Sequence, residues 1–138
     1  MREAVIVSYA RTGMAKANRG SLNDTHGITM AGHAIKGAIE RAGISAADVD
    51  EVILGQVLTA AQGMNPARQA AMGAGIPKEK TAWSLNQVCG SGLRAVCLGM
   101  QQIATGDADI IVAGGQENMT LSPHAAHLRA GHKMGDMK

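Results

Sequence analysis

Aromatic residues are almost missing from this sequence of 138 residues, which has no Phe, one Trp (Trp83) and one Tyr (Tyr9). Proteins that bind single-stranded nucleic acid stack bases on aromatic side chains, and nucleic-acid sites in general carry a basic stripe. The 13 Lys and Arg residues are interleaved with 11 Asp and Glu residues, and the net charge is only +2. The composition therefore argues against nucleic acid as a partner.

Long hydrophobic runs are missing as well. No apolar segment approaches the roughly 20 residues that a membrane-spanning helix needs. The first apolar run, Ala4–Tyr9, follows an acidic residue at position 3 and is too short for a secretory signal peptide. These two absences predict a protein with no membrane partner.

Cysteine is scarce, since the chain has only Cys89 and Cys97, with seven residues between them. Neither cysteine has a histidine at the spacing of a zinc ligand, and two cysteines do not make a disulfide framework. We therefore predict no metal site. The cysteine usage favours a reducing compartment, which we take to be the cytoplasm.

Glycine and methionine are abundant, with 18 and nine residues, and apolar residues make up 46% of the chain. Small aliphatic side chains and flexible methionines must therefore fill the core, and the glycines allow tight turns and close backbone approaches. The length suits one domain with a single core. This composition is typical of an α/β protein.

Four segments are predicted to be strands, and three segments with helical periodicity lie between them. The predicted strands are Ala4–Tyr9, Val49–Leu58, Thr81–Val88 and Asp109–Ala113; the predicted helices run from Ile28 to a stop at Gly43, from Pro66, capped by Asn65, to about Ala74, and from Leu93 to Gly106. Alternation of this kind gives right-handed crossovers. We therefore expect an α/β fold with a mostly parallel sheet and helices on both faces.

The sequence changes character after the fourth predicted strand. Residues 116–138 contain three of the five histidines and three of the nine methionines, and they show no sustained periodicity. We interpret residues 1–118 as an α/β domain that is incomplete. Residues 119–138 are then the start of an excursion out of that domain.

Cys89 occupies the most informative position, in the segment Asn86-Gln87-Val88-Cys89-Gly90-Ser91-Gly92 between the third predicted strand and the third helix. Free N–H groups and the dipole at a helix N-terminus stabilise negative charge, which favours the thiolate, the form of cysteine that attacks. The same N–H groups could hold the oxyanion that forms when a carbonyl is attacked. Gly90 and Gly92 leave room for a substrate. The pattern predicts a nucleophile on a sharp strand-to-helix turn.

One structural interpretation competes with a nucleophile at Cys89. Free cysteines are usually buried, so position alone also allows Cys89 to be a small core residue. Cys97 differs, because it lies on the apolar stripe from Leu93 to Met100 and is therefore predicted to be a core residue.

A dinucleotide site is the other alternative, because Gly90-x-Gly92-x-x-Ala95 matches a variant of the dinucleotide fingerprint. Glu117, after the next strand, would be its ribose ligand. Three features argue against it. The preceding strand is polar at Ser84, Asn86 and Gln87, the motif falls in the third strand–helix unit, and a nicotinamide site needs no cysteine.

The segment around Cys89 resembles the motif that carries the acyl-enzyme cysteine of thiolases. Other segments agree with the family in order and spacing: Ala10-Arg11-Thr12, Gly20-Ser21-Leu22, Val52-Ile53-Leu54-Gly55, Gln62–Ala71, Gly75-Ile76-Pro77 and Ala113–Met119. The resemblance covers essentially the whole chain. Leu121–His124 and Lys133-Met134-Gly135 are similar to acetyl-CoA acetyltransferases in particular. Gly13 departs from the family, which commonly has proline there, and this difference does not touch the chemistry.

The resemblance implies that Cys89 takes an acetyl group from acetyl-CoA and releases coenzyme A. A second acetyl-CoA then attacks the acyl-enzyme to give acetoacetyl-CoA. Coenzyme A thioesters are substrates here, and no cofactor is implied. The family's second cysteine, histidine and asparagine would lie beyond this chain, so we expect the chain alone to be inactive. Val88 is the expected lining residue next to the thiol, and Met134 is expected to reach a neighbouring subunit's site.

Two further functions stay open. The chain could belong to a longer-chain 3-ketoacyl-CoA thiolase, or it could be a non-catalytic fragment that only dimerises. Thr81–Asn86 is expected at a sheet edge, where Trp83 and Leu85 would pair with a second copy in a homodimer or homotetramer.

Several polar residues are assigned structural roles. Asn86 is predicted to tie down the turn that holds Cys89, and Glu117 and Asn118 to hydrogen-bond a buried turn. His33 lies off the apolar stripe and is predicted at the surface. A metal role is disfavoured for the three histidines of the tail, which are His124, His127 and His132.

Overall fold

The computed structural model describes residues 2–126 of the chain. Its elements, in chain order, are α1 (Gly27–Ala42), a short 3₁₀ helix η1 (Ala46–Asp48), β1 (Glu51–Gly55), α2 (Pro66–Gly73), β2 (Thr81–Leu85), α3 (Ser91–Thr105) and β3 (Ile111–Gly115). No helix within the described residues is both long and apolar enough to cross a membrane.

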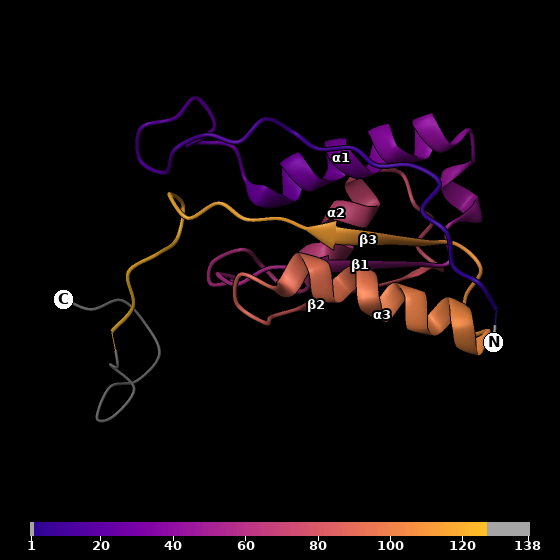
Figure 1. The fold of residues 1–138 in the computed structure, drawn as a ribbon. Coiled ribbons are helices and arrows are strands. Elements are labelled where there is room, and N and C mark those ends of the chain that lie inside the picture. The colour runs from indigo at the N-terminus through magenta and orange to yellow at the C-terminus, as the bar shows by residue number, and fades with distance from the viewer. Residues whose placement is uncertain (1, 127–138) are drawn as a thin grey trace.

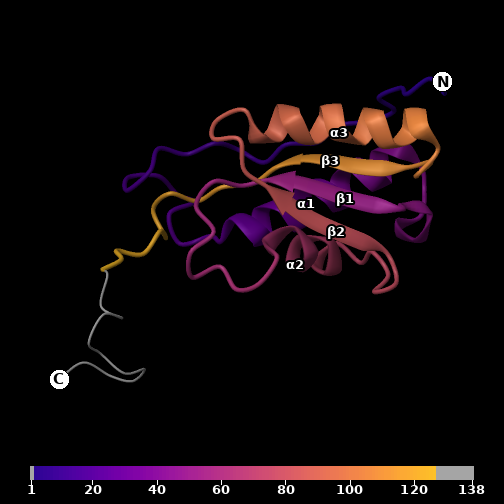
Figure 2. The same cartoon turned by 90° about the horizontal axis from the view of Figure 1, so that it is seen from below.

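The three strands form one parallel sheet in the order β2-β1-β3. Helices α1 and α2 cover one face of this sheet and α3 covers the other, which gives three layers (Figures 1 and 2). The predicted parallel α/β fold with helices on both faces is therefore confirmed. The register places Gly55, at the end of β1, between Leu85 of β2 and Gly115 of β3.

Strand β1 is buried on both faces, as the central strand of a covered parallel sheet should be. Val52, Ile53 and Leu54 are all at most 3% exposed. The main core lies under α1 and α2, where Val52 and Leu54 meet Ile35 and Ile39 of α1 and a set of small residues from α2. Alanines dominate the α2 side of this core: Ala67, Ala70, Ala71 and Ala74. Their small side chains allow α2 to lie close to the sheet.

The predicted helix ends are confirmed. Gly43 and Gly106 follow α1 and α3 in the left-handed conformation, with φ values of 69° and 86°. This region of φ suits glycine, which has no Cβ to clash with the backbone. Asn65 caps α2 because its side chain accepts the backbone N–H of Arg68, and Pro66 is the first residue of that helix.

The N-terminal strand predicted at Ala4–Tyr9 is not formed, and this prediction is wrong for the structure as described. Residues 2–16 have no regular secondary structure, and Ile6 and Tyr9 are 80% and 81% exposed. The segment lies along α1, where the hydroxyl of Ser8 donates to the carbonyl of Ala38. A strand needs a neighbouring strand to pair its backbone N–H and C=O groups. Within residues 2–126 this segment pairs with no strand, and β propensity alone does not make it one.

The other three predicted strands exist with different limits. Strand β1 begins two residues later and ends three residues earlier than Val49–Leu58, and β2 stops at Leu85 instead of Val88. Strand β3 is displaced by two residues from Asp109–Ala113. The boundary predicted at residue 118 stays a prediction, since residues 127–138 are outside the described part.

Helix α3 turns its small residues to the sheet. Its buried residues are Ser91, Ala95 and Gly99. By contrast, Leu93 is 72% and Met100 is 54% exposed, so the apolar stripe predicted to pack in the core does not do so. The reason is distance, because a Cβ on Gly99 would lie 3.2 Å from Cγ2 of Ile111 in β3. A helix that approaches a strand this closely can place only small side chains between them.

Candidate active site

Cys89 lies beyond the carboxyl end of β2, on the turn that leads into α3, and its side chain is exposed. It faces an open groove of about 1160 Å³ at the carboxyl ends of the strands. The groove is lined by Met14, Leu58 and Met119 among others, by Val88 beside the thiol, and by Gly114 and Gly115 at the end of β3. Ligands of open α/β sheets bind at this edge.

The turn before Cys89 has an unusual backbone conformation. Val88 has a φ of 51°, in the left-handed region. A β-branched residue is strongly disfavoured there because its Cβ crowds the backbone. Asn86 stabilises this conformation, since its Oδ1 accepts the backbone N–H of Val88 at 2.9 Å. The predicted role of Asn86 in the Cys89 turn is thereby confirmed.

Ser91 makes a second set of contacts with the same turn. Its Oγ accepts the backbone N–H of Gln87 at 2.8 Å and donates to the carbonyl of Val88 at 2.5 Å. The backbone N–H of Ser91 also donates to that carbonyl, at 3.1 Å. Ser91 is only 4% exposed. The buried Ser91 thus forms hydrogen bonds with Gln87 and Val88, the two residues before Cys89.

Glycines allow the start of α3 to touch the sheet. A Cβ on Gly55 would lie 2.4 Å from the carbonyl carbon of Ser91 and 2.6 Å from the nitrogen of Gly92. A Cβ on Gly115 would lie 3.5 Å from Cα of Gly92. The N-terminus of α3 therefore rests on the ends of β1 and β3, and at Gly55 there is no space for any side chain.

The turn and the start of α3 leave backbone N–H groups available to a ligand. Within the described residues, the N–H groups of Cys89 and Gly92 donate to no acceptor. Such groups at a helix N-terminus stabilise negative charge, on a thiolate or on an oxyanion. The turn can therefore stabilise both charges that arise when a thiol attacks a carbonyl.

Polar side chains brace the end of the sheet below the turn. The Glu117 carboxylate accepts the N–H of Val57 at 2.8 Å and that of Leu58 at 3.3 Å. The Asn118 side-chain amide donates to carbonyls of the loop before α1, at Leu22, Asn23 and Thr25. Both residues hydrogen-bond a turn, as predicted, but the segments that they contact are partly exposed and not buried.

The remaining predicted residues are distributed as follows. Cys97 is half-buried on α3 and so is not the core residue that was predicted. His33 is exposed, as expected. Met134, His127 and His132 lie outside the described residues. Among residues 2–126, no group of three or more His, Cys, Asp and Glu side chains is placed to hold a metal ion.

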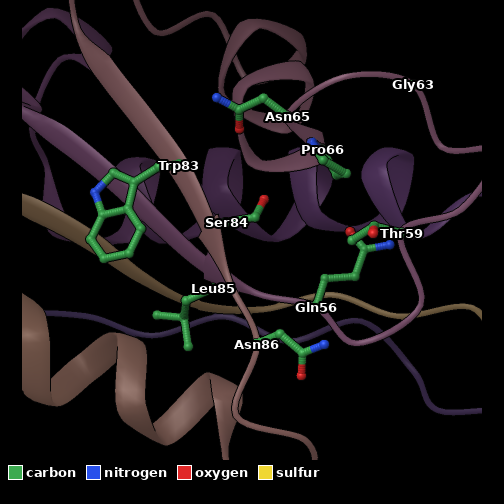
Figure 3. A pocket seen from close by; sticks show the side chains of 9 residues that line it. All are labelled: Gln56, Thr59, Gly63, Asn65, Pro66, Trp83, Ser84, Leu85 and Asn86. Atoms are coloured by element: carbon green, nitrogen blue, oxygen red, sulfur yellow. The ribbon is translucent and has the colours of Figure 1, made fainter.

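A second, smaller hollow of about 500 Å³ lies beside β2 and does not include Cys89 (Figure 3). Trp83 and Leu85 lie on one side of β2, while Ser84 points to the other side, where Pro66 lies and where the Ser84 Oγ accepts the N–H of Ala67 in α2. Strand β2 is an edge of the sheet, as predicted. Trp83 is half-buried.

The fold and the turn together define an α/β protein that presents a cysteine on a strand-to-helix junction. The family model described as "Thiolase, N-terminal domain" matches residues 4–138. The chain belongs to the thiolase family.

Relatives of known name agree with this assignment. The acetyl-CoA acetyltransferase of Rhizobium meliloti (strain 1021) is 63% identical over 134 residues, which cover 97% of this chain and 34% of the relative. That of Shinella zoogloeoides is 58% identical over 135 residues, covering 98% and 34%. The cytosolic acetyl-CoA acetyltransferase of Rattus norvegicus is 51% identical over 133 residues, covering 96% and 33%. The chain thus spans about a third of the length of these relatives.

The sequence alone did not identify Gly55 and Ser91 as determinants of the site. Both residues stand inside segments that carry the resemblance, but nothing in their local pattern indicates contact across 36 positions of the chain. A left-handed valine is also unpredictable, because every propensity argues against it. The available signal was the glycine at the end of a buried strand, which often marks a close backbone approach.

Proposed function

We propose that this chain supplies the acyl-accepting cysteine of an acetyl-CoA acetyltransferase. The observation that carries the proposal is the exposed thiol of Cys89 on the turn into α3, where the N–H groups of Cys89 and Gly92 have no acceptor within the described residues. The relatives named acetyl-CoA acetyltransferase support acetyl-CoA and coenzyme A as the substrates. Coenzyme A thioesters then enter as substrates, and the proposal needs no cofactor.

The first step transfers an acetyl group. The Cys89 thiolate attacks the thioester carbonyl of acetyl-CoA, and the carbonyl oxygen becomes an oxyanion that the N–H groups of Cys89 and Gly92 can stabilise. The bond from the carbonyl carbon to the coenzyme A sulfur then breaks. Coenzyme A leaves as a thiolate and takes up a proton, and Cys89 retains the acetyl group as a thioester.

The second step forms a carbon–carbon bond. A second acetyl-CoA transfers a proton from the carbon next to its carbonyl to a base, proposed to be the family's second cysteine outside this chain. The resulting enolate attacks the acetyl group on Cys89. The bond to the Cys89 sulfur breaks, acetoacetyl-CoA leaves, and the thiolate is restored. The reverse reaction is thiolysis of acetoacetyl-CoA by coenzyme A. Val88, which lines the groove beside the sulfur, is proposed to contact the acyl group.

A homo-oligomer is proposed as the working assembly, formed through the edge of β2. An unpaired strand edge is a template for another chain, and a two-fold axis there would extend the sheet. Trp83 and Leu85 supply apolar area at this edge. A cytoplasmic location is also proposed, in line with the relative that is named as cytosolic.

The proposal is tested by incubating the chain with acetyl-CoA at neutral pH, followed by acid quenching and peptide mass spectrometry. We expect a hydroxylamine-sensitive acetyl group on Cys89, formed faster than on glutathione under the same conditions. The Cys89→Ser variant and the second cysteine, Cys97, are the controls. Acetylation of Cys97 to the same extent as Cys89, or no acetylation of either, would contradict the proposed function.

A further inference from the structure

The conformation of Val88 raises the question of what holds the turn in place. A valine at a φ of 51° is strained, and such strain persists only where the surroundings enforce it. Strained residues of this kind concentrate at functional sites, and Val88 directly precedes the cysteine to which we assign the chemistry. Two side chains contact the peptide groups on either side of Val88, namely Asn86 and Ser91.

Of these two, only Ser91 is buried. Asn86 is exposed, so water can replace its hydrogen bond to the Val88 N–H. Ser91 is 4% exposed, and its Oγ both accepts from Gln87 and donates to Val88. Loss of this hydroxyl would leave the N–H of Gln87 without its acceptor. Only the backbone N–H of Ser91 would then hold the carbonyl of Val88.

Ser91 is itself fixed by the sheet. The backbone of Gly55 lies so close that a Cβ on Gly55 would be 2.5 Å from Cβ of Ser91. Gly55 is paired on both sides, with Leu85 and with Gly115. The Ser91 hydroxyl is therefore held by a rigid support. Through it, the central strand of the sheet fixes the position of the Cys89 turn.

We infer that Ser91 is a positioning residue for the Cys89 thiol, whose hydroxyl, backed by Gly55, keeps Val88 left-handed. This inference rests on the proposed role of Cys89 and adds to it a residue that does not touch the substrate. With Val88 in this conformation, Cys89 is held on the turn directly before the first residues of α3, whose N–H groups stabilise negative charge. Without it, Val88 relaxes to a negative φ and the sulfur moves away from them.

Alkylation of the two cysteines tests this inference without any acyl donor. Rates at Cys89 and Cys97 are measured by peptide mass spectrometry with iodoacetamide, which is neutral, and with iodoacetate, which is an anion. We expect Ser91→Ala to slow alkylation of Cys89 about fivefold, the change that corresponds to one ordinary hydrogen bond. The rate ratio of iodoacetate to iodoacetamide should fall at Cys89 as well, because the anion gains most from the N–H groups.

The controls separate positioning from stability. Thr105→Ala removes a hydroxyl that caps the other end of α3, where it donates to Gln101, and should leave Cys89 unchanged. Cys97 lies in the same helix and should keep its rate in every variant. Glycine adopts a positive φ without strain, so adding Val88→Gly to Ser91→Ala should restore part of the lost rate. If Ser91 only stabilised the fold, Ser91→Ala would also change the alkylation rate of Cys97. The added Val88→Gly substitution would then not restore the rate at Cys89.

Several results would overturn the inference. One is a Cys89 rate and reagent ratio unchanged by Ser91→Ala, and another is an equal loss in Thr105→Ala. If circular dichroism shows that Ser91→Ala does not fold, Ser91→Gly replaces it, and an unchanged Cys89 rate in that variant is equally fatal. Alkylation is independent of acetyl transfer. A Cys89 that takes no acetyl group therefore refutes the proposed function and leaves the positioning result intact.

Discussion

Asp50 and Ile110 hold each other by two hydrogen bonds across the sheet. The N–H of Asp50 donates to the carbonyl of Ile110 at 2.9 Å, and the Asp50 carboxylate accepts the N–H of Ile110 at 3.0 Å. The same carboxylate accepts the N–H of Asp109 at 2.9 Å and pairs with the Lys80 ammonium at 3.2 Å. One side chain thus joins the beginnings of all three strands.

These contacts predict an acid-sensitive stability. The N–H of Asp109, then that of Ile110, and finally Lys80 hold the pKa of the Asp50 carboxyl below its usual value, against an opposing effect of partial burial. A carboxyl with a lowered folded-state pKa stabilises the fold above its unfolded pKa of about 3.9. That contribution is lost as the pH falls through the folded-state value.

Asp50→Asn should therefore lower the free energy of unfolding at pH 7 by on the order of 1 kcal/mol, since the carboxylate is partly exposed. The difference from the unmodified chain should shrink toward pH 3. Urea unfolding at several pH values measures both effects. Asp24→Asn, at an exposed position, is the control. A difference that does not depend on pH would contradict the assigned role of the charge.

Gly55→Ala should be strongly destabilising, because its Cβ would lie within 2.6 Å of three atoms of Ser91 and Gly92. We expect a loss of about 2–4 kcal/mol in the free energy of unfolding. Gly73→Ala is the matched control, since a Cβ on Gly73 meets nothing within 4 Å. That variant should be neutral or gain up to about 1 kcal/mol, as alanine favours a helix. Equal stability of the two variants would show that α3 does not rest on Gly55.

Cys89 should react with iodoacetamide before Cys97 does. The Cys89 side chain is exposed on the turn that leads into α3, whereas Cys97 is half-buried in the middle of that helix. Peptide mapping after substoichiometric labelling at neutral pH measures the preference. In denaturant the two cysteines should label alike, which serves as the control. Preferential labelling of Cys97 in the folded chain would refute the assignment.

The 138-residue chain is expected to show no thiolysis of acetoacetyl-CoA. A cysteine nucleophile in this chemistry works with a base, and no histidine lines the Cys89 groove within the described residues. Spectrophotometric loss of acetoacetyl-CoA in the presence of coenzyme A measures turnover. An enzyme-like rate of about 1 s⁻¹ or more that Cys89→Ala abolishes would contradict this expectation.

Leu85→Lys should convert the proposed dimer into a monomer. A charge at the apolar edge of β2 opposes pairing of that edge with a second copy. Sedimentation velocity measures the mass, and circular dichroism verifies the fold. Met14→Lys, at an 83% exposed position away from β2, should leave the assembly unchanged. A folded Leu85→Lys variant that stays dimeric would place the interface elsewhere.

The sequence predicted those features that depend on neighbouring residues. Gly43, Asn65 and Gly106 mark helix ends through backbone conformation and capping, which depend on neighbouring residues only. The cysteine turn was likewise recognisable, since its position between a strand and a helix follows from the order of elements. The parallel sheet follows from the same order.

Predictions that depended on distant contacts failed. Ala4–Tyr9 has the side chains of a strand, yet strand formation depends on a partner that no local pattern specifies. The hydrophobicity of Leu93 and Met100 predicted that their face of α3 packs in the core. The short distance between α3 and β3 instead leaves room only for small residues on the packed face. In both cases the deciding quantity is a distance between elements, which a single sequence does not encode in any one segment.

The glycine contacts under α3 have one more consequence. Gly55, Gly92 and Gly115 are in contact through main-chain atoms. No side chain of these three residues therefore separates the sheet from the start of α3. Mutations that repack the alanine-rich core beneath α2 can change side-chain volumes there without altering this junction. The position of the Cys89 turn therefore depends on backbone contacts and not on the side-chain volumes of that core.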